Sequence, residues 1–153
     1  MIKKVAKYIF WFVGLLFLQV VVLSNIGFSK WVFPFAYVFF FLYMEKGIPK
    51  WLMLLLGFAM GLIVDMYLNT HGLHTFATTL IAFIRPYVLA PLSPRDSVSE
   101  NIKPTFRNLG LKKYLLYASI LILIHHLFVF YMDELSIDSF FLTFLQVVIS
   151  SIS

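Results

Sequence analysis

Long apolar runs separated by short polar stretches make up most of this chain. A helix needs about 20 apolar residues to cross a bilayer, and four of the runs meet that length directly. In all, the pattern predicts six transmembrane helices, at approximately residues 5–23, 26–44, 51–68, 73–92, 114–132 and 137–153. We therefore expect an all-α, polytopic bundle that forms a single transmembrane domain over residues 1–153.

The second and sixth runs fit this expectation less well than the others. The second is short and contains Pro34, so its helix has to begin near Ile26 or to bend. The sixth, from Ile137 to Ile152, rises about 24 Å, whereas the hydrocarbon core is about 30 Å thick. Either the bilayer thins at this helix or the sequence stops within it.

Basic residues gather in alternate loops of the predicted bundle. One set of loops and the N-terminus contain nearly all of them, namely Lys3, Lys4, Lys7, Lys46, Lys50, Arg95, Lys103, Arg107, Lys112 and Lys113. The opposite loops contain Lys30 and the acidic Asp133, Glu134 and Asp138. The positive-inside rule then predicts that both termini and the 93–113 loop are cytoplasmic. The first run is too long for a signal peptide and lacks a cleavage site, so we expect an uncleaved helix.

Composition agrees with a membrane protein. Hydrophobic residues make up 61% of the 153 residues and charged residues 12%, and the mean hydropathy is +0.93. The basic loops account for the net charge of +5, so this charge does not require a nucleic-acid partner, and we expect none. The absence of Cys excludes a disulfide framework and any thiolate nucleophile or metal ligand.

Asp65 is an acidic residue inside the third apolar run. A carboxylate at the centre of a membrane helix costs about 2.5–3.5 kcal/mol on insertion scales, so it usually has a partner. Gly57 and Gly61 precede it at four-residue intervals, and Asn69 continues the same helix face. Small residues at this spacing let two helices approach closely. We expect the face to pack against another helix or to contact a partner protein, and we expect the same two uses for Gly72 in the turn that follows.

Several polar residues are predicted to lie at one depth in the membrane. Counting along each helix places Gln19, Asp65, His74, His125 and His126 in the outer half of the bilayer. Such a cluster has three open interpretations, which are a small-molecule pocket, a proton relay and a hydrogen-bonded lock of the bundle. The adjacent histidines point about 100° apart on a helix, and no metal-binding, catalytic or cofactor motif accompanies them. We therefore expect no metal, cofactor or catalytic residue.

Arg85 lies in the fourth run, near its inner end. It is close enough to the interface for the guanidinium to snorkel, or to contact lipid phosphate or a partner helix. Arg95, Lys103 and Arg107 follow in the 93–113 loop. These residues either set the topology alone or also bind anionic lipid or an acidic partner.

The motifs around Asp65 resemble a known family. The pattern Gly57-x-x-x-Gly61-Leu-Ile-Val-Asp65, followed by Gly72-Leu73-His74, is similar to the core of the rod shape-determining protein MreD family. Three further segments look like one branch of it, namely residues 85–89 (Arg-Pro-Tyr-Val-Leu), 93–96 (Ser-Pro-Arg-Asp) and 123–126 (Leu-Ile-His-His). The resemblance covers nearly the whole chain, although members normally complete the sixth helix.

The resemblance implies a non-catalytic subunit of the elongasome in the bacterial cytoplasmic (inner) membrane. The implied partners are an MreC-like bitopic membrane protein and, indirectly, MreB, RodA and a penicillin-binding transpeptidase, all of which maintain rod cell shape. The family's fold is also similar to the S components of energy-coupling-factor transporters, which leaves small-molecule binding or transport as an alternative. The Ala-x-x-x-Ala pattern by which S components dock is replaced here by Ala6, Phe10 and Gly14.

Overall fold

The computed structural model describes residues 2–25, 35–93, 103–134 and 140–152, and the described residues contain helices and turns without any strand. Helix α1 (Ile2–Phe17) continues into a π-helical turn, η1 (Leu18–Leu23). The remaining helices are α2 (Val38–Tyr43), α3 (Lys50–Leu68), α4 (Leu73–Leu92), α5 (Phe106–Leu109), α6 (Leu111–Glu134) and α7 (Phe140–Ile152). The all-α class predicted from the sequence is confirmed for these residues.

Four helices are long and apolar enough to cross a membrane. They are Val5–Leu23, Lys50–Leu68, Leu73–Leu92 and Leu111–Met132, and they correspond to the first, third, fourth and fifth predicted spans. The predicted sixth span contains α7, which has 13 residues, while positions 137–139 and 153 lie outside the described residues. The total of six spans therefore stays a prediction.

The second predicted span differs most from the structure. Where a helix was expected over 26–44, the described part is helical only at Val38–Tyr43, and residues 35–37 form the turn that leads into it. Pro34 supplies a physical reason, because a proline in the interior of a helix removes a backbone hydrogen bond and its ring clashes with the preceding turn, so one regular helix over 26–44 is disfavoured. Six residues rise about 9 Å, so α2 alone is too short to span the bilayer.

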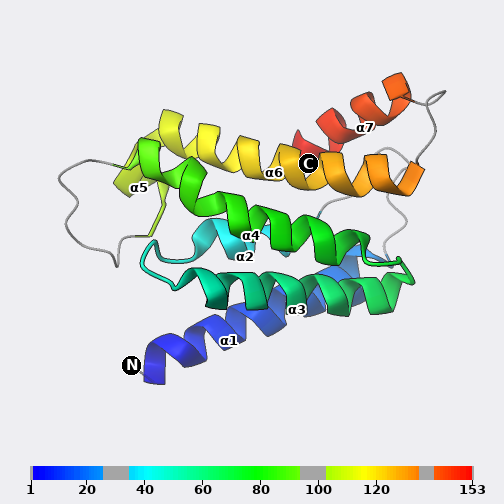
Figure 1. Ribbon diagram of the computed structural model, residues 1–153. Helices are drawn as coiled ribbons and strands as arrows, with labels where there is room; N and C mark the ends of the chain where they lie inside the picture. Colours follow the sequence, from blue (N-terminus) through cyan, green and yellow to red (C-terminus); the bar gives the residue numbers. More distant parts are fainter. Residues whose placement is uncertain (1, 26–34, 94–102, 135–139, 153) are drawn as a thin grey trace.

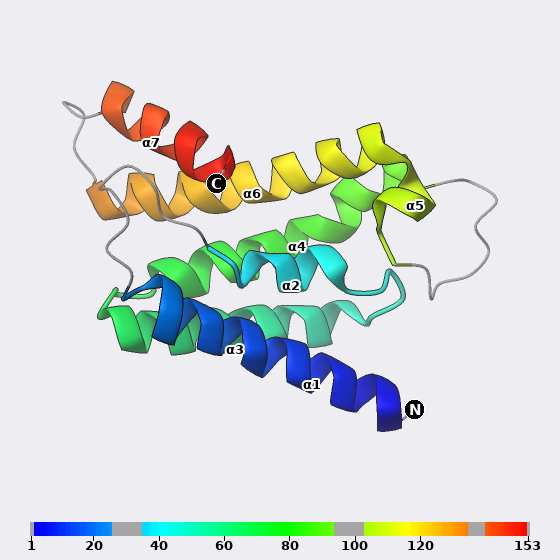
Figure 2. The same cartoon turned by 180° about the vertical axis from the view of Figure 1, so that it is seen from behind.

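The long helices lie side by side, and α4 packs between α3 and α6 (Figure 1). Helix α7 packs on the outer side of α6, and α1 crosses close to α3. On the other side of this layer, α2 packs against α4 (Figure 2). The short helix is therefore held among longer ones.

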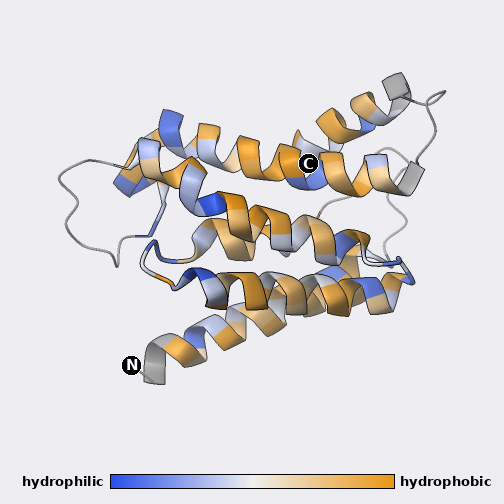
Figure 3. Cartoon of the chain, in the orientation of Figure 1, coloured by the Kyte–Doolittle hydropathy of each residue, from blue (hydrophilic) through white to orange (hydrophobic). Residues whose placement is uncertain are grey.

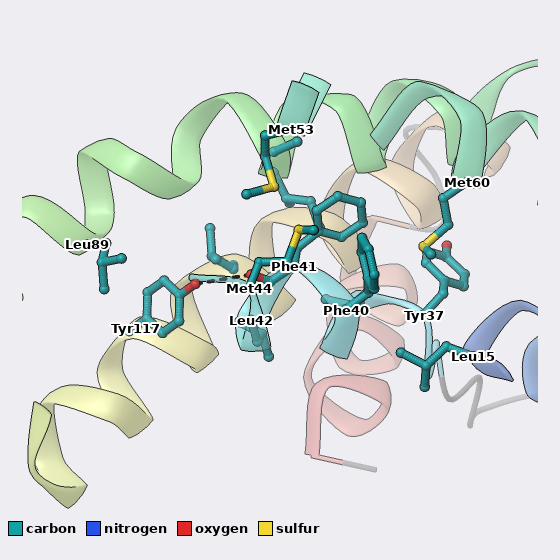
Figure 4. Packing of buried hydrophobic residues seen from close by; sticks show 14 of the residues in the cluster. Leu15, Tyr37, Phe40, Phe41, Leu42, Met44, Met53, Met60, Leu89 and Tyr117 are labelled. Carbon is teal, nitrogen blue, oxygen red and sulfur yellow. Dashed lines mark hydrogen bonds between the residues drawn. The ribbon is translucent and has the colours of Figure 1, made fainter. Parts of the chain in front are cut away.

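The hydrophobic core is centred on α2. Its residues Val38, Phe40, Phe41 and Leu42 are at most 3% exposed, and they contact buried residues of α1, α3, α4 and α6 (Figure 4). Many large apolar side chains are instead exposed on the outer faces of the long helices. The middle of the long helices is mostly apolar (Figure 3). A bilayer can cover such surfaces, so their exposure agrees with a membrane protein.

One end of the bundle collects the basic residues. The N-terminus, the turn between α2 and α3 and the start of α6 all lie at this end, and the turn between α3 and α4 lies at the other (Figure 1). We call the first the basic end, and the Lys and Arg residues of the described ranges at this end are Lys3, Lys4, Lys7, Lys46, Lys50, Lys103, Arg107, Lys112 and Lys113. The basic segments that the sequence analysis assigned to one side of the membrane thus lie at one end of the bundle.

Candidate functional site

Asp65 lies on α3 and faces the first turn of α4. One carboxylate oxygen, Oδ1, accepts hydrogen bonds from the Thr70 hydroxyl (2.5 Å) and the His74 backbone N–H (3.0 Å), and it lies 3.1 Å from His74 Nδ1. The other, Oδ2, accepts from the Thr75 backbone N–H (2.7 Å) and the Thr75 hydroxyl (2.5 Å). Both oxygens are thus fully engaged by donors from one turn and one helix end.

This arrangement makes Asp65 the N-terminal cap of α4. The first backbone N–H groups of a helix have no partner within the helix, and they carry the positive end of its dipole. Gly72, the residue at the cap position of α4, has no side chain to supply an acceptor. The carboxylate of Asp65 therefore supplies it from the neighbouring helix.

The turn between α3 and α4 depends on two left-handed residues. Asn69 ends α3 at φ 55°, and Gly72 precedes α4 at φ 90°. No atom lies within 4 Å of a Cβ built on Gly72, so a glycine is needed there for its positive φ and not for lack of space. Gly72 is therefore not a packing contact among the described residues, and its contact with a partner stays a prediction.

Gly57 and Gly61 face α4 of the same chain. A Cβ on Gly61 would lie 2.3 Å from Thr78 Oγ1 and 2.4 Å from the Cα of Thr75, and a Cβ on Gly57 would lie 3.0 Å from the backbone oxygen of Thr78. The Thr78 hydroxyl also donates to the backbone oxygen of Gly57 (2.8 Å). Of the two uses expected for this face, the structure shows helix packing, and α4 covers it from any partner.

The three buried histidines surround the ring of Phe35. Its ring centre lies 5.5 Å from that of His74, 5.3 Å from that of His125 and 5.0 Å from that of His126. His125 Nε2 and the Tyr37 hydroxyl are hydrogen-bonded at 2.9 Å. The histidines are at most 3% exposed, so a phenyl ring occupies the centre of the cluster.

Asp65 and the histidines are therefore brought together as the depth estimate proposed, with Asp65 joined through His74. Gln19 is not hydrogen-bonded to this group. Its side-chain oxygen instead accepts from the backbone N–H of Ala36 (2.8 Å), so it holds the turn before α2. Sequence reasoning missed Phe35 and Tyr37, because nothing distinguishes two aromatics among 18 Phe and eight Tyr except their position after Pro34.

Arg85 is 2% exposed, so its side chain is buried within the bundle. Its Nε donates to the backbone oxygen of Phe41 (2.6 Å), and its Nη2 donates to the backbone oxygen of Met44. Nε also lies 3.0 Å from the Tyr117 hydroxyl. The expectation of a snorkelling or lipid-binding arginine is therefore corrected, because the guanidinium caps the last carbonyl groups of α2.

The remaining predicted contact residues lie at the basic end. Lys103 Nζ lies 4.4 Å from the ring centre of Tyr43 and 5.8 Å from that of Tyr8. The Arg107 guanidinium lies 5.8 Å from the ring centre of its neighbour Phe106, and its side chain is exposed. Arg95 lies outside the described residues.

Among the residues that the structure describes, no three His, Asp or Glu side chains come together in a group able to hold a metal ion. Comparisons with protein-family models, with curated proteins and with solved structures find no match to this chain. The geometry of the buried polar residues and the motif resemblance are therefore the basis for a functional proposal.

Proposed function

We propose that the protein is a non-catalytic, multi-pass subunit of the bacterial elongasome, and that it serves as a scaffold in the cytoplasmic membrane with both termini in the cytoplasm. Its direct partner in this proposal is an MreC-like bitopic protein, through which it acts with MreB, RodA and a penicillin-binding transpeptidase. The motif resemblance to the MreD family supplies these identities. They rest on that resemblance alone.

One observation favours a scaffold over a chemical function. The polar side chains at membrane depth bind the backbone of their own chain, as Asp65 does at α4 and as Gln19 and Arg85 do at α2. Polar residues inside a bilayer usually mark either a functional pathway or an interhelical tie. Here the hydrogen bonds go to backbone groups at or next to helix ends, which supports a role in holding the helices together.

The S-component alternative requires a pocket near the polar cluster. The ring of Phe35 lies among the three buried histidines, where a ligand of that pocket would have to bind. This placement favours the scaffold, and the experiment below distinguishes the two.

We place the partner contact on α1. Only 17% of the residues in its most apolar stretch are buried, compared with 33% in the corresponding stretch of each of the other three long helices. Phe10 and Phe17 are 75% and 60% exposed, and no atom lies within 4 Å of a Cβ built on Gly14 between them. A bitopic partner has a single helix to offer, and an open face with a small residue allows close approach.

The test is photo-crosslinking combined with affinity capture from the source bacterium. A photoreactive amino acid at Phe10 should crosslink a bitopic MreC-like protein, whereas one at Met66 of α3, which is 73% exposed, should not. Depletion of the protein should round the cells without changing vitamin uptake. Capture of an ATPase pair with its membrane coupling subunit, or of a stoichiometric vitamin, would refute the scaffold proposal.

A further inference from the structure

An apolar groove opens between α1, α2 and the beginning of α6. Its volume is about 360 Å³, and its wall includes Tyr8, Trp11, Leu18, Ala36, Tyr43 and Tyr114. The groove exists because α1 diverges from α2 toward its own N-terminus (Figure 2). At the far end, the bond between Gln19 and Ala36 brings the two segments together.

Two ammonium groups lie at the mouth of this groove. Lys7 Nζ lies 6.0 Å and Lys103 Nζ 4.4 Å from the ring centre of Tyr43, which is one of the groove residues. Glu45 is an acidic residue at the same mouth, where it interacts with Tyr8. Among the described side chains named here, two positive charges against one negative charge leave the mouth positive.

The length of the groove identifies the kind of molecule that fits it. Tyr8 and Leu18 are ten residues apart on one helix, which corresponds to about 15 Å. This is half of a hydrocarbon core of about 30 Å, and so it matches one leaflet. A partner helix that crosses the bilayer needs about 20 residues and the full thickness, whereas a lipid tail needs only the leaflet in which its headgroup lies.

We propose that this groove binds one anionic phospholipid of the leaflet at the basic end. An acyl chain lies along the apolar wall, and the phosphate group is bound by Lys7 and Lys103. Basic side chains at a membrane surface attract anionic lipid, by roughly fivefold in affinity per residue. The proposal does not depend on the elongasome assignment, because it rests on the groove and its charges alone.

Trp11 in the groove wall provides a direct probe. The chain has three Trp residues, so Trp31→Phe with Trp51→Phe leaves Trp11 as the only one. This protein is reconstituted in phosphatidylcholine vesicles that contain increasing fractions of a dibrominated lipid, either phosphatidylglycerol or phosphatidylcholine with the same chains. Bromine quenches Trp fluorescence on contact, and we expect half-maximal quenching at a several-fold lower fraction of the anionic lipid.

Charge variants locate the headgroup. Lys7→Gln with Lys103→Gln should lower the preference for phosphatidylglycerol by about fivefold per lysine, and Glu45→Gln should increase it. Lys112→Gln with Lys113→Gln is the matched control, because it removes two exposed charges from the same end without altering the groove. It should leave the preference nearly unchanged.

Three results would overturn the proposal. Equal quenching by the two lipids would mean ordinary lipid contact, and an equal effect of the control pair would mean a diffuse surface charge. Trp11 shielded from both lipids would mean that a second copy or a partner helix covers the groove.

Discussion

At the scale of single residues, Asp65 shows why a carboxylate is tolerated at membrane depth. The unpaired N–H groups at the start of α4 have no water to bind inside a bilayer, and each would cost several kcal/mol if left without an acceptor. The carboxylate accepts two of these N–H groups and two hydroxyl groups as well. Its desolvation cost is offset by donors that would otherwise lack partners.

Asp65→Asn should destabilise the protein by about 1–3 kcal/mol, because an amide nitrogen would replace one acceptor oxygen and face donor groups. Equilibrium unfolding in mixed micelles measures the loss. Thr70→Val, which removes a single donor to Asp65, should cost less. An Asn variant as stable as the parent protein would show that the second acceptor oxygen is not needed.

The glycines on the same face give a graded prediction. Gly61→Ala should be the most damaging, by about 1–3 kcal/mol, because its Cβ would meet the backbone of α4 at 2.4 Å. Gly57→Ala should cost less, since its closest contact is 3.0 Å. Gly14→Ala is the matched control in open space, and better helix propensity should make it neutral or slightly stabilising. Unfolding free energies that do not follow this order would contradict the packing of α3 on α4.

At the scale of the elements, α2 is the least regular part of the bundle. A helix this short leaves most of its backbone groups without intrahelical partners, and irregular backbone is tolerated at membrane depth only where protein surrounds it. Gln19 binds the turn before α2, and Arg85 binds its last carbonyl groups. Two spanning helices thereby position a segment that cannot span by itself.

Arg85→Met should loosen the packing of α2. Two buried carbonyl groups would lose their donor, and each loss should lower the free energy of unfolding by about 1–3 kcal/mol. Arg85→Lys should retain part of the stability, because a single ammonium lacks the fork that reaches both carbonyl groups. Hydrogen–deuterium exchange should rise at residues 38–43 in both variants, more strongly for Met.

Arg107→Gln is the control for this comparison. It also removes an arginine, but this one is exposed, and no hydrogen bond joins it to α2 among the described residues. If exchange in α2 rises equally in this variant, or if it stays unchanged in Arg85→Met, the capping role is wrong.

At the scale of the whole molecule, the charge asymmetry predicts how the bundle is oriented. Apart from the buried Arg85, the described Lys and Arg residues collect at one end, whereas the α3–α4 turn at the other end contains no Lys or Arg (Figure 1). The positive-inside rule then assigns the basic end to the cytoplasm.

Single cysteines in this Cys-free chain test the orientation on intact cells. His71→Cys should react with an impermeant maleimide and Asn108→Cys should not, while both should react after permeabilisation. His71 is a better position than its neighbour Asn69, whose φ of 55° disfavours a cysteine. Labelling of Asn108→Cys before permeabilisation would reverse the assigned topology.

The sequence by itself determined the features that depend on neighbouring residues. The four long spans follow from apolar length, the basic end follows from loop charges, and the importance of Asp65 follows from an acid inside an apolar run. The contact between Asp65 and the first turn of α4 was also within reach, because only ten residues separate Asp65 from Thr75. The spans, Asp65 and its contact are local, so a stretch of about 20 residues contains each of them, and the basic end needs only the order of the loops along the chain.

Only the tertiary structure decided the partners that lie far apart in sequence. Arg85 is 44 residues from Phe41, and Tyr37 is 88 residues from His125. Phe35 lies among three histidines because α4 and α6 pack on the segment that precedes α2. Helical periodicity states which side of a helix is polar, but the neighbour that side meets depends on how all the helices pack. For that reason the short α2, its two caps and the groove beside it emerge only in three dimensions.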